Sequence, residues 1–172
     1  MTPYPAHEAG SHNAASSSVS EDPTGPFTGA AFDRMYLIED CKPKSVLPSV
    51  GRLMYLDWRG DAKAALAAGD SLYQSLPHGP LWGRIAVFMG QRLDASGQSQ
   101  QALAPLLALA EQQPDDRLAP LARQLAGDIY LLRLKQDSEA LAQYEECLTR
   151  YPRAWNSAEV RRRMESVKKR RL

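Results

Sequence analysis

Two histidines and a glutamate near the N-terminus come closest to a metal-binding motif in this sequence. His7, Glu8 and His12 are the residue types of a zinc-protease helix, in which two histidines hold the metal and a glutamate is the base. That motif needs histidines four residues apart, on one helical face, whereas His7 and His12 are five residues apart. We therefore expect no metal site here.

The remaining reactive side chains do not form a set. His78 lies in a Pro-His-Gly-Pro turn, where we expect it to be exposed. Cys41 and Cys147 are far apart and match no metal-binding or redox spacing. Cys147 lies on an apolar helical stripe, which favours a buried small hydrophobe over a reactive thiol. The sequence also lacks a glycine-rich phosphate loop and a nucleophile elbow. We expect a non-enzymatic protein with no cofactor and no small-molecule substrate.

Composition points to one domain with an uneven charge. The chain has 172 residues, 44% of them apolar, and a formal charge of only +1. Nine basic and two acidic residues lie between Arg150 and Leu172, a net charge of +7 that leaves −6 on the other 149 residues. Arginine outnumbers lysine, and alanine and leucine are abundant, which is typical of a GC-rich bacterial source.

No segment of the sequence predicts export or membrane insertion. The first 30 residues lack both the basic start and the apolar run of a signal peptide. The longest apolar stretch, residues 102–110, is about half as long as a membrane span. We expect a cytoplasmic protein, with peripheral attachment to a membrane as the alternative.

Small residues and prolines recur three times with the same spacing. Successive sets are 37 and 38 residues apart, the period range of stacked helix pairs. Lysine takes the place of glycine in the third set. The sets are Gly60, Ala65 and Pro77; Gly97, Ala102 and Pro114; and Lys135, Ala140 and Pro152.

Apolar residues between these sets follow the helical period throughout. Leu121, Leu125, Ile129 and Leu132 form one such stripe, and no segment alternates with the period of a strand. Pro105 falls inside a predicted helix, which we expect to start late or to kink there. The sequence therefore predicts an all-α fold: an α-solenoid of three antiparallel helix pairs plus a C-terminal capping helix.

Several small residues have a local explanation in this fold. Gly60 and Gly97 suit turns with positive φ, which costs glycine nothing. Gly90 and Ala102 are small where two antiparallel helices cross, so that the backbones can approach closely.

The chain divides into four regions by composition. Residues 1–30 are rich in Ser, Pro, Gly and Ala, which predicts a disordered arm. Residues 31–45 carry a short apolar segment with Phe32, Met35 and Tyr36, which either caps the helical stack or docks another protein. Residues 46–156 hold the helix pairs, and residues 157–172 form a basic helix.

Residues 83–116 resemble a tetratricopeptide repeat, with Gly90, Gly97, Ala102 and Pro114 at its signature positions. Residues 46–79 are similar, although Leu53 replaces the first glycine. A third unit matches through Gly127, Ala140, Tyr144 and Pro152, with one extra residue in its internal turn.

The resemblance covers about residues 46–170. Its last part, from Tyr144 to Met164, is similar to repeats of bacterial cell-envelope assembly proteins. It implies a scaffold that binds a protein partner, either an adaptor or an accessory subunit of a larger complex.

In such folds the first helix of each pair lines a concave surface. The positions that we expect to face solvent there are mildly acidic, and a partner helix or extended segment with basic residues would suit them. The alternative is that they are ordinary solvated helix faces. These positions are Asp57, Trp58, Arg84, Gln91, Asp94, Gln124 and Asp128.

The basic C-terminal helix offers a second surface around Val160, Met164 and Val167. In one interpretation this apolar line caps the stack and the basic residues keep the end soluble. In the other, the basic residues of the helix bind an acidic protein or an anionic membrane. Nucleic acid is disfavoured, because the rest of the chain is acidic and few aromatics accompany the arginines. The basic residues are Arg161, Arg162, Arg163, Lys168, Lys169, Arg170 and Arg171.

A non-catalytic adaptor is thus the leading hypothesis. The rival is a peripheral protein that binds an anionic membrane or nucleic acid through the C-terminal helix.

Overall fold

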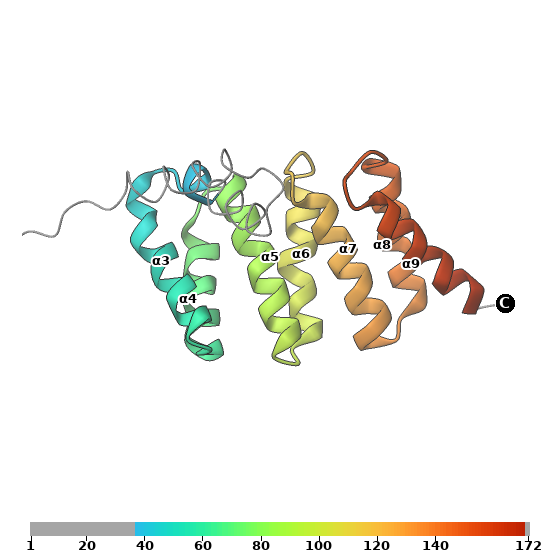
Figure 1. The fold of residues 1–172 in the computed structure, drawn as a ribbon, viewed down its shortest axis with the longest axis horizontal. Coiled ribbons are helices and arrows are strands. Elements are labelled where there is room, and N and C mark those ends of the chain that lie inside the picture. The colour runs from blue at the N-terminus through green and yellow to red at the C-terminus, as the bar shows by residue number, and fades with distance from the viewer. Residues whose placement is uncertain (1–36, 171–172) are drawn as a thin grey trace, which may run out of the picture. The chain divides into compact units, whose positions relative to one another are not determined.

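The computed structural model describes residues 37–170, and this part of the chain is helical with no β-strand (Figure 1). The predicted all-α class is confirmed for these residues. They belong to two compact units that divide between Pro48 and Ser49. Several predicted features lie outside the described part: the arm of residues 1–30, the apolar residues Phe32, Met35 and Tyr36, and the basic Arg171. In the first unit, residues 37–40 are helical and a 3-10 turn, η1, spans Lys44–Val46.

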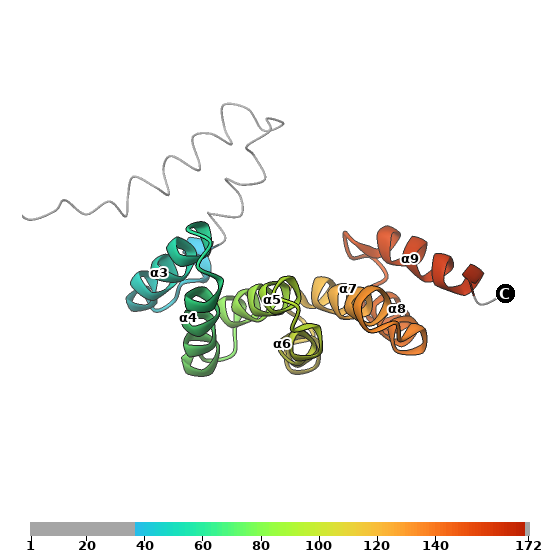
Figure 2. The same cartoon turned by 90° about the horizontal axis from the view of Figure 1, so that it is seen from below.

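The second unit holds α3 from Ser49 onward and all later elements, in a serial arrangement. From α4 onward each helix packs against the next, whereas α3 makes no comparably extensive contact with α4 within the described residues. Figure 2 shows α5 and α7 along one side of the row, with α6 and α8 on the other. The elements are α3 (Leu47–Trp58), α4 (Ala62–Ser75), α5 (Pro80–Ala95), α6 (Ser99–Gln112), α7 (Ala119–Ile129), the π-helical η2 (Tyr130–Leu134), α8 (Asp137–Arg150) and α9 (Ser157–Arg170).

Glycines set the close approach of two helix pairs. A Cβ atom on Gly90 of α5 would lie 2.5 Å from Cγ of Leu106 on α6, and one on Gly127 of α7 would overlap the ring of Tyr144 on α8. Ala102 is fully buried at the first of these crossings. The small residues therefore let a large side chain of the partner helix lie directly on the backbone.

The three turn positions of the repeat share a left-handed backbone. The φ angles are 77° at Gly60, 79° at Gly97 and 59° at Lys135. The expectation of positive φ at both glycines is confirmed. Lys135 adopts the same conformation with a side chain, which strains an L-residue.

The helical segment that precedes Lys135 ends in a wide turn. There α7 continues into η2, and the backbone N–H of Gln136 closes the end on the carbonyl of Tyr130 at 2.8 Å. Inserting one residue into a helix commonly produces such a wider π turn.

Pro105 lies inside α6 without delaying the helix. The helix begins at Ser99 and runs through the buried Pro105 to Gln112. Pro105 removes one backbone N–H bond of this helix, and the helix continues past it. The expected late start is therefore wrong.

Candidate functional site

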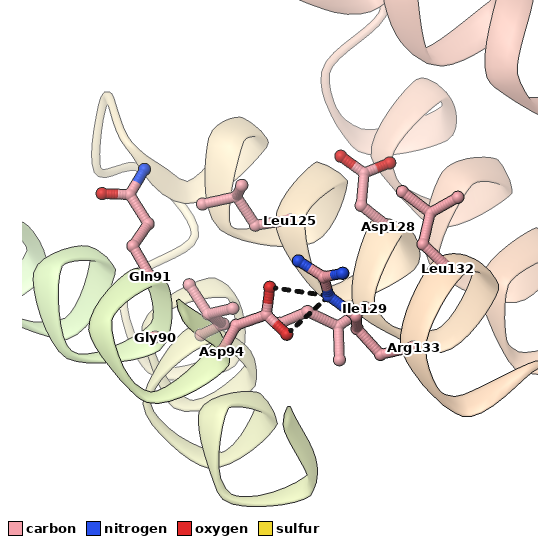
Figure 3. Close-up of a pocket in the computed structure, with 9 residues that line it drawn as sticks. Gly90, Gln91, Asp94, Leu125, Asp128, Ile129, Leu132 and Arg133 are labelled. Atoms are coloured by element: carbon pink, nitrogen blue, oxygen red, sulfur yellow. Dashed lines mark hydrogen bonds and ion pairs between the residues drawn. The ribbon is translucent and has the colours of Figure 1, made fainter. Parts of the chain in front are cut away.

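A hollow of about 150 Å³ lies between α5 and α7 (Figure 3). Its floor is apolar, and its polar lining includes the predicted partner-binding residues Gln91, Asp94 and Asp128. The structure therefore brings three of the candidate residues together. The lining residues are Gly90, Gln91, Asp94, Leu106, Leu125, Asp128, Ile129, Leu132 and Arg133.

Leucines of α7 and η2 supply much of the apolar lining. The face of α7 that enters the core carries small residues, including the fully buried Ala122 and Ala126. Leu125 is left half-buried, and Leu132 in η2 is 54% exposed. The sequence pattern places both leucines on one helical apolar stripe. Because the wide turn of η2 shifts the helical register, Leu131 is buried and Leu132 faces outward.

Asp94 is held by two donors on one wall of the hollow. The Ser99 hydroxyl donates to its carboxylate at 2.6 Å, and Nε of Arg133 lies 3.3 Å from both carboxylate oxygens. Figure 3 shows Arg133 reaching across to Asp94. The Arg133 side chain is 57% exposed, so water screens this ion pair.

Asp128 lies in a tighter network on the other wall. The buried Tyr144 hydroxyl donates to it at 2.6 Å, and Arg163 of α9 forms an ion pair with it. Glu159 holds the same guanidinium at 2.8 Å. Burial, together with the neighbouring carboxylate, raises the pKa of Tyr144 well above its usual range, so this phenol stays protonated as a donor.

Two residues assigned to the basic surface of α9 are engaged within the fold. Arg163 pairs with Asp128, and Lys168 pairs with Glu145 of α8 at 2.9 Å. Val160 and Val167 are fully buried against α8, so α9 packs on the end of the row through its apolar line. The exposed basic residues of α9 are Arg161, Arg162, Lys168, Lys169 and Arg170, and of these Lys168 is the one paired with Glu145.

Gln124 does not face solvent as expected. Its side chain is buried, with 8% exposure, and its Oε1 accepts a hydrogen bond of 2.9 Å from Asn156. Asn156 also donates to the carbonyl of Pro120 at 3.0 Å. The segment before α9 folds over α7 and covers Gln124, which excludes it from the hollow.

The other three candidates do not line the hollow. Asp57 of α3 pairs with Arg92 of α5, with an O–N distance of 2.7 Å. Trp58 is strongly exposed, and Arg84 is half-buried. Whether these residues bind a partner stays a prediction.

Arg123 joins α7 to α8 and is not singled out by the sequence analysis. This buried arginine of α7 donates to Gln143 at 2.8 Å and to Glu146 at 2.7 Å, both on α8. It lies between Ala122 and Gln124 on the inward face of α7, and a single arginine carries no signal in sequence that separates it from surface arginines.

The reactive side chains remain dispersed in the described part of the chain. His78 is exposed beside the ring of Trp82, at 4.6 Å between ring centroids. Cys147 is fully buried, and burial raises the pKa of its thiol to about 11. Within residues 37–170, no three His, Cys, Asp or Glu side chains are placed to hold a metal ion. No helix of this same part combines the length and apolar character needed to cross a membrane.

Comparison with family models, with curated proteins and with solved structures gave no match for this chain. Its function is therefore argued from its own residues and their geometry.

Proposed function

We propose that this protein is a non-catalytic interaction module, an adaptor or accessory subunit with a tetratricopeptide-like α-solenoid of three antiparallel helix pairs and a capping helix. Serial packing from α4 to α9 supports this architecture. Equivalent positions also share a backbone conformation, since φ is positive at the turn residues Gly60, Gly97 and Lys135.

The hollow between α5 and α7 is the observation that carries the functional proposal. Leu125 and Leu132 leave apolar surface uncovered beside a space of about 150 Å³. That space is the size of one branched or aromatic side chain. Burying such a side chain contributes about 1.5–3 kcal/mol, enough to anchor a partner segment.

The charged residues at the rim of the hollow favour a partner segment that carries a basic residue next to the apolar one. Among the residues that the structure describes, the ion pair of Asp94 is with the exposed Arg133, at 3.3 Å, and the Ser99 hydroxyl also donates to the carboxylate. Because water screens this ion pair, a lysine or arginine of a partner can compete with Arg133 for the carboxylate. Asp128 on the opposite wall is already paired with Arg163, so Asp94 is the carboxylate more open to a partner's cation. We therefore expect a helix or extended segment in which an apolar residue lies next to a basic one.

A native pull-down with matched variants tests this proposal. Leu132→Glu places a charge in the hollow at an exposed position that the fold tolerates, and circular dichroism checks the helix content. Glu111→Lys is the control, because Glu111 is exposed on α6 and does not line the hollow. We expect a stoichiometric partner with the wild-type chain and the control, and its loss with Leu132→Glu. Equal recovery by all three chains, or recovery of no partner, would contradict the proposal.

A further inference from the structure

The turn between α8 and α9 holds a tryptophan outward on an anchored backbone. Trp155 is 72% exposed. The backbone around it is hydrogen-bonded, from Ala154 N to Tyr151 O and from Ser157 N to Ala154 O, each at 3.0 Å. The next residue, Asn156, is buried and bonded to α7. The indole is therefore presented to solvent by a fixed turn rather than by a loose end.

Basic side chains surround this turn. Arg153 is exposed two residues before Trp155. The guanidinium of Arg161 donates to the carbonyl of Pro152 at 3.4 Å, which places it beside the same turn. Arg162 follows on the exposed side of α9, where it pairs with Glu159.

The outer side of α9 extends this basic character along the helix. Because Val160 and Val167 face the core, helical geometry puts Arg162 and Lys169 on the opposite side. Lys169 and Arg170 are exposed and form no ion pair with any residue in 37–170. One exposed acid, Glu165, lies among them. The basic face is here defined as Arg153, Arg161, Arg162, Lys169 and Arg170.

We propose that the basic face, with Trp155 at its end, binds the surface of an anionic lipid bilayer. Each basic residue near such a surface contributes about 1 kcal/mol. An indole with an apolar body and a polar N–H is suited to the headgroup region, where Trp is enriched. This membrane contact is separate from the partner-binding hollow and does not depend on it.

A bilayer fits these features better than a nucleic acid does. Proteins that bind single strands use several aromatic side chains along the path of the strand. The basic face carries one tryptophan, at one end. The residues outside the segment 150–172 have a net charge of −6, which disfavours a long polyanion that would extend past this face.

Vesicle flotation of the full chain measures this binding directly. We expect binding to phosphatidylcholine vesicles that contain phosphatidylglycerol, no binding to phosphatidylcholine alone, and release by salt. The double substitution Arg162→Ala/Lys169→Ala should weaken binding about 30-fold, because two contributions of about 1 kcal/mol are lost. The matched control Arg52→Ala/Lys63→Ala removes the same charge from exposed positions on α3 and α4 and should bind as the wild type does.

Fluorescence of Trp155 reports whether the indole enters the interface. In a Trp58→Phe chain the remaining tryptophans are the buried Trp82 and the exposed Trp155. Anionic vesicles should shift the emission of this chain to the blue, and Trp155→Ala should weaken binding several-fold. Absence of vesicle binding, an unchanged emission, or equally tight binding to duplex DNA through the same residues would each overturn the proposal.

Discussion

The Tyr144 hydroxyl of α8 donates a hydrogen bond of 2.6 Å to the Asp128 carboxylate of α7. Asp128 also pairs with Arg163 of α9, so one carboxylate on the wall of the hollow joins three helices. The position of α9 and the shape of the candidate site therefore depend on the same acidic side chain.

Removing the Tyr144 hydroxyl should lower stability without changing the fold. We expect Tyr144→Phe to lower the free energy of unfolding by about 1–2 kcal/mol, because a hydrogen bond to a charged acceptor is lost. Urea unfolding of Tyr144→Phe, Asp128→Ala and the double variant gives the coupling between the two residues. Strictly additive effects would mean that the hydrogen bond contributes nothing.

The helix crossing at Gly90 should not tolerate a methyl group. Gly90→Ala puts a Cβ 2.5 Å from Leu106, and we expect a loss of about 1–3 kcal/mol in unfolding free energy. Gly51→Ala is the matched control, since Gly51 lies within α3 and has no neighbour within 4 Å of an added Cβ. That substitution should stabilise the protein by about 0.5–1 kcal/mol. Equal effects at both glycines would contradict the packing described for α5 and α6.

Relieving the strained backbone at Lys135 should stabilise the protein. Its φ of 59° is left-handed, and glycine occupies the same slot in the two earlier turns. We expect Lys135→Gly to raise the free energy of unfolding by about 1 kcal/mol. Lys135→Ala keeps the strain and controls for loss of the charge, so a gain of the same size with alanine would argue against this explanation.

The buried Cys147 thiol should make stability fall at alkaline pH. Burial raises its pKa from 9.0 to about 11, so between these values the unfolded chain releases a proton that the folded chain retains. The contribution is present in full below pH 9 and is lost as the pH rises toward 11, about 2–3 kcal/mol in all. Urea unfolding at several pH values should show a smaller loss in Cys147→Ala than in the wild type, because the raised pKa of Tyr144 is present in both chains. Parallel curves for the two chains would refute it.

Local features of the fold were predictable from sequence. The turns at Gly60 and Gly97 could be predicted because the positive φ of a turn is set by a few neighbouring residues. Gly90 indicated a close crossing because a residue without a side chain, in an otherwise apolar helix, lets a neighbouring helix approach. These signals need no knowledge of distant partners.

The errors arose where distant segments meet. Gln124 was expected in the groove, but Asn156, 32 residues away, covers it. Arg163 was assigned to a free basic surface, yet its partner Asp128 lies on another helix. The sequence pattern put Leu132 on one helical stripe with Ile129, but η2 interrupts that register, so that Ile129 is buried and Leu132 is 54% exposed.

Site-specific cross-linking in cells of the source organism tests the central proposal most directly. A photoreactive amino acid at Gln91, which is exposed and lines the hollow, should capture one partner protein, and the same group at Glu111 on α6 should not. Adding Leu132→Glu should abolish the capture at Gln91 while the protein stays folded. Capture that survives Leu132→Glu, or that occurs equally at Glu111, would contradict docking in the hollow between α5 and α7.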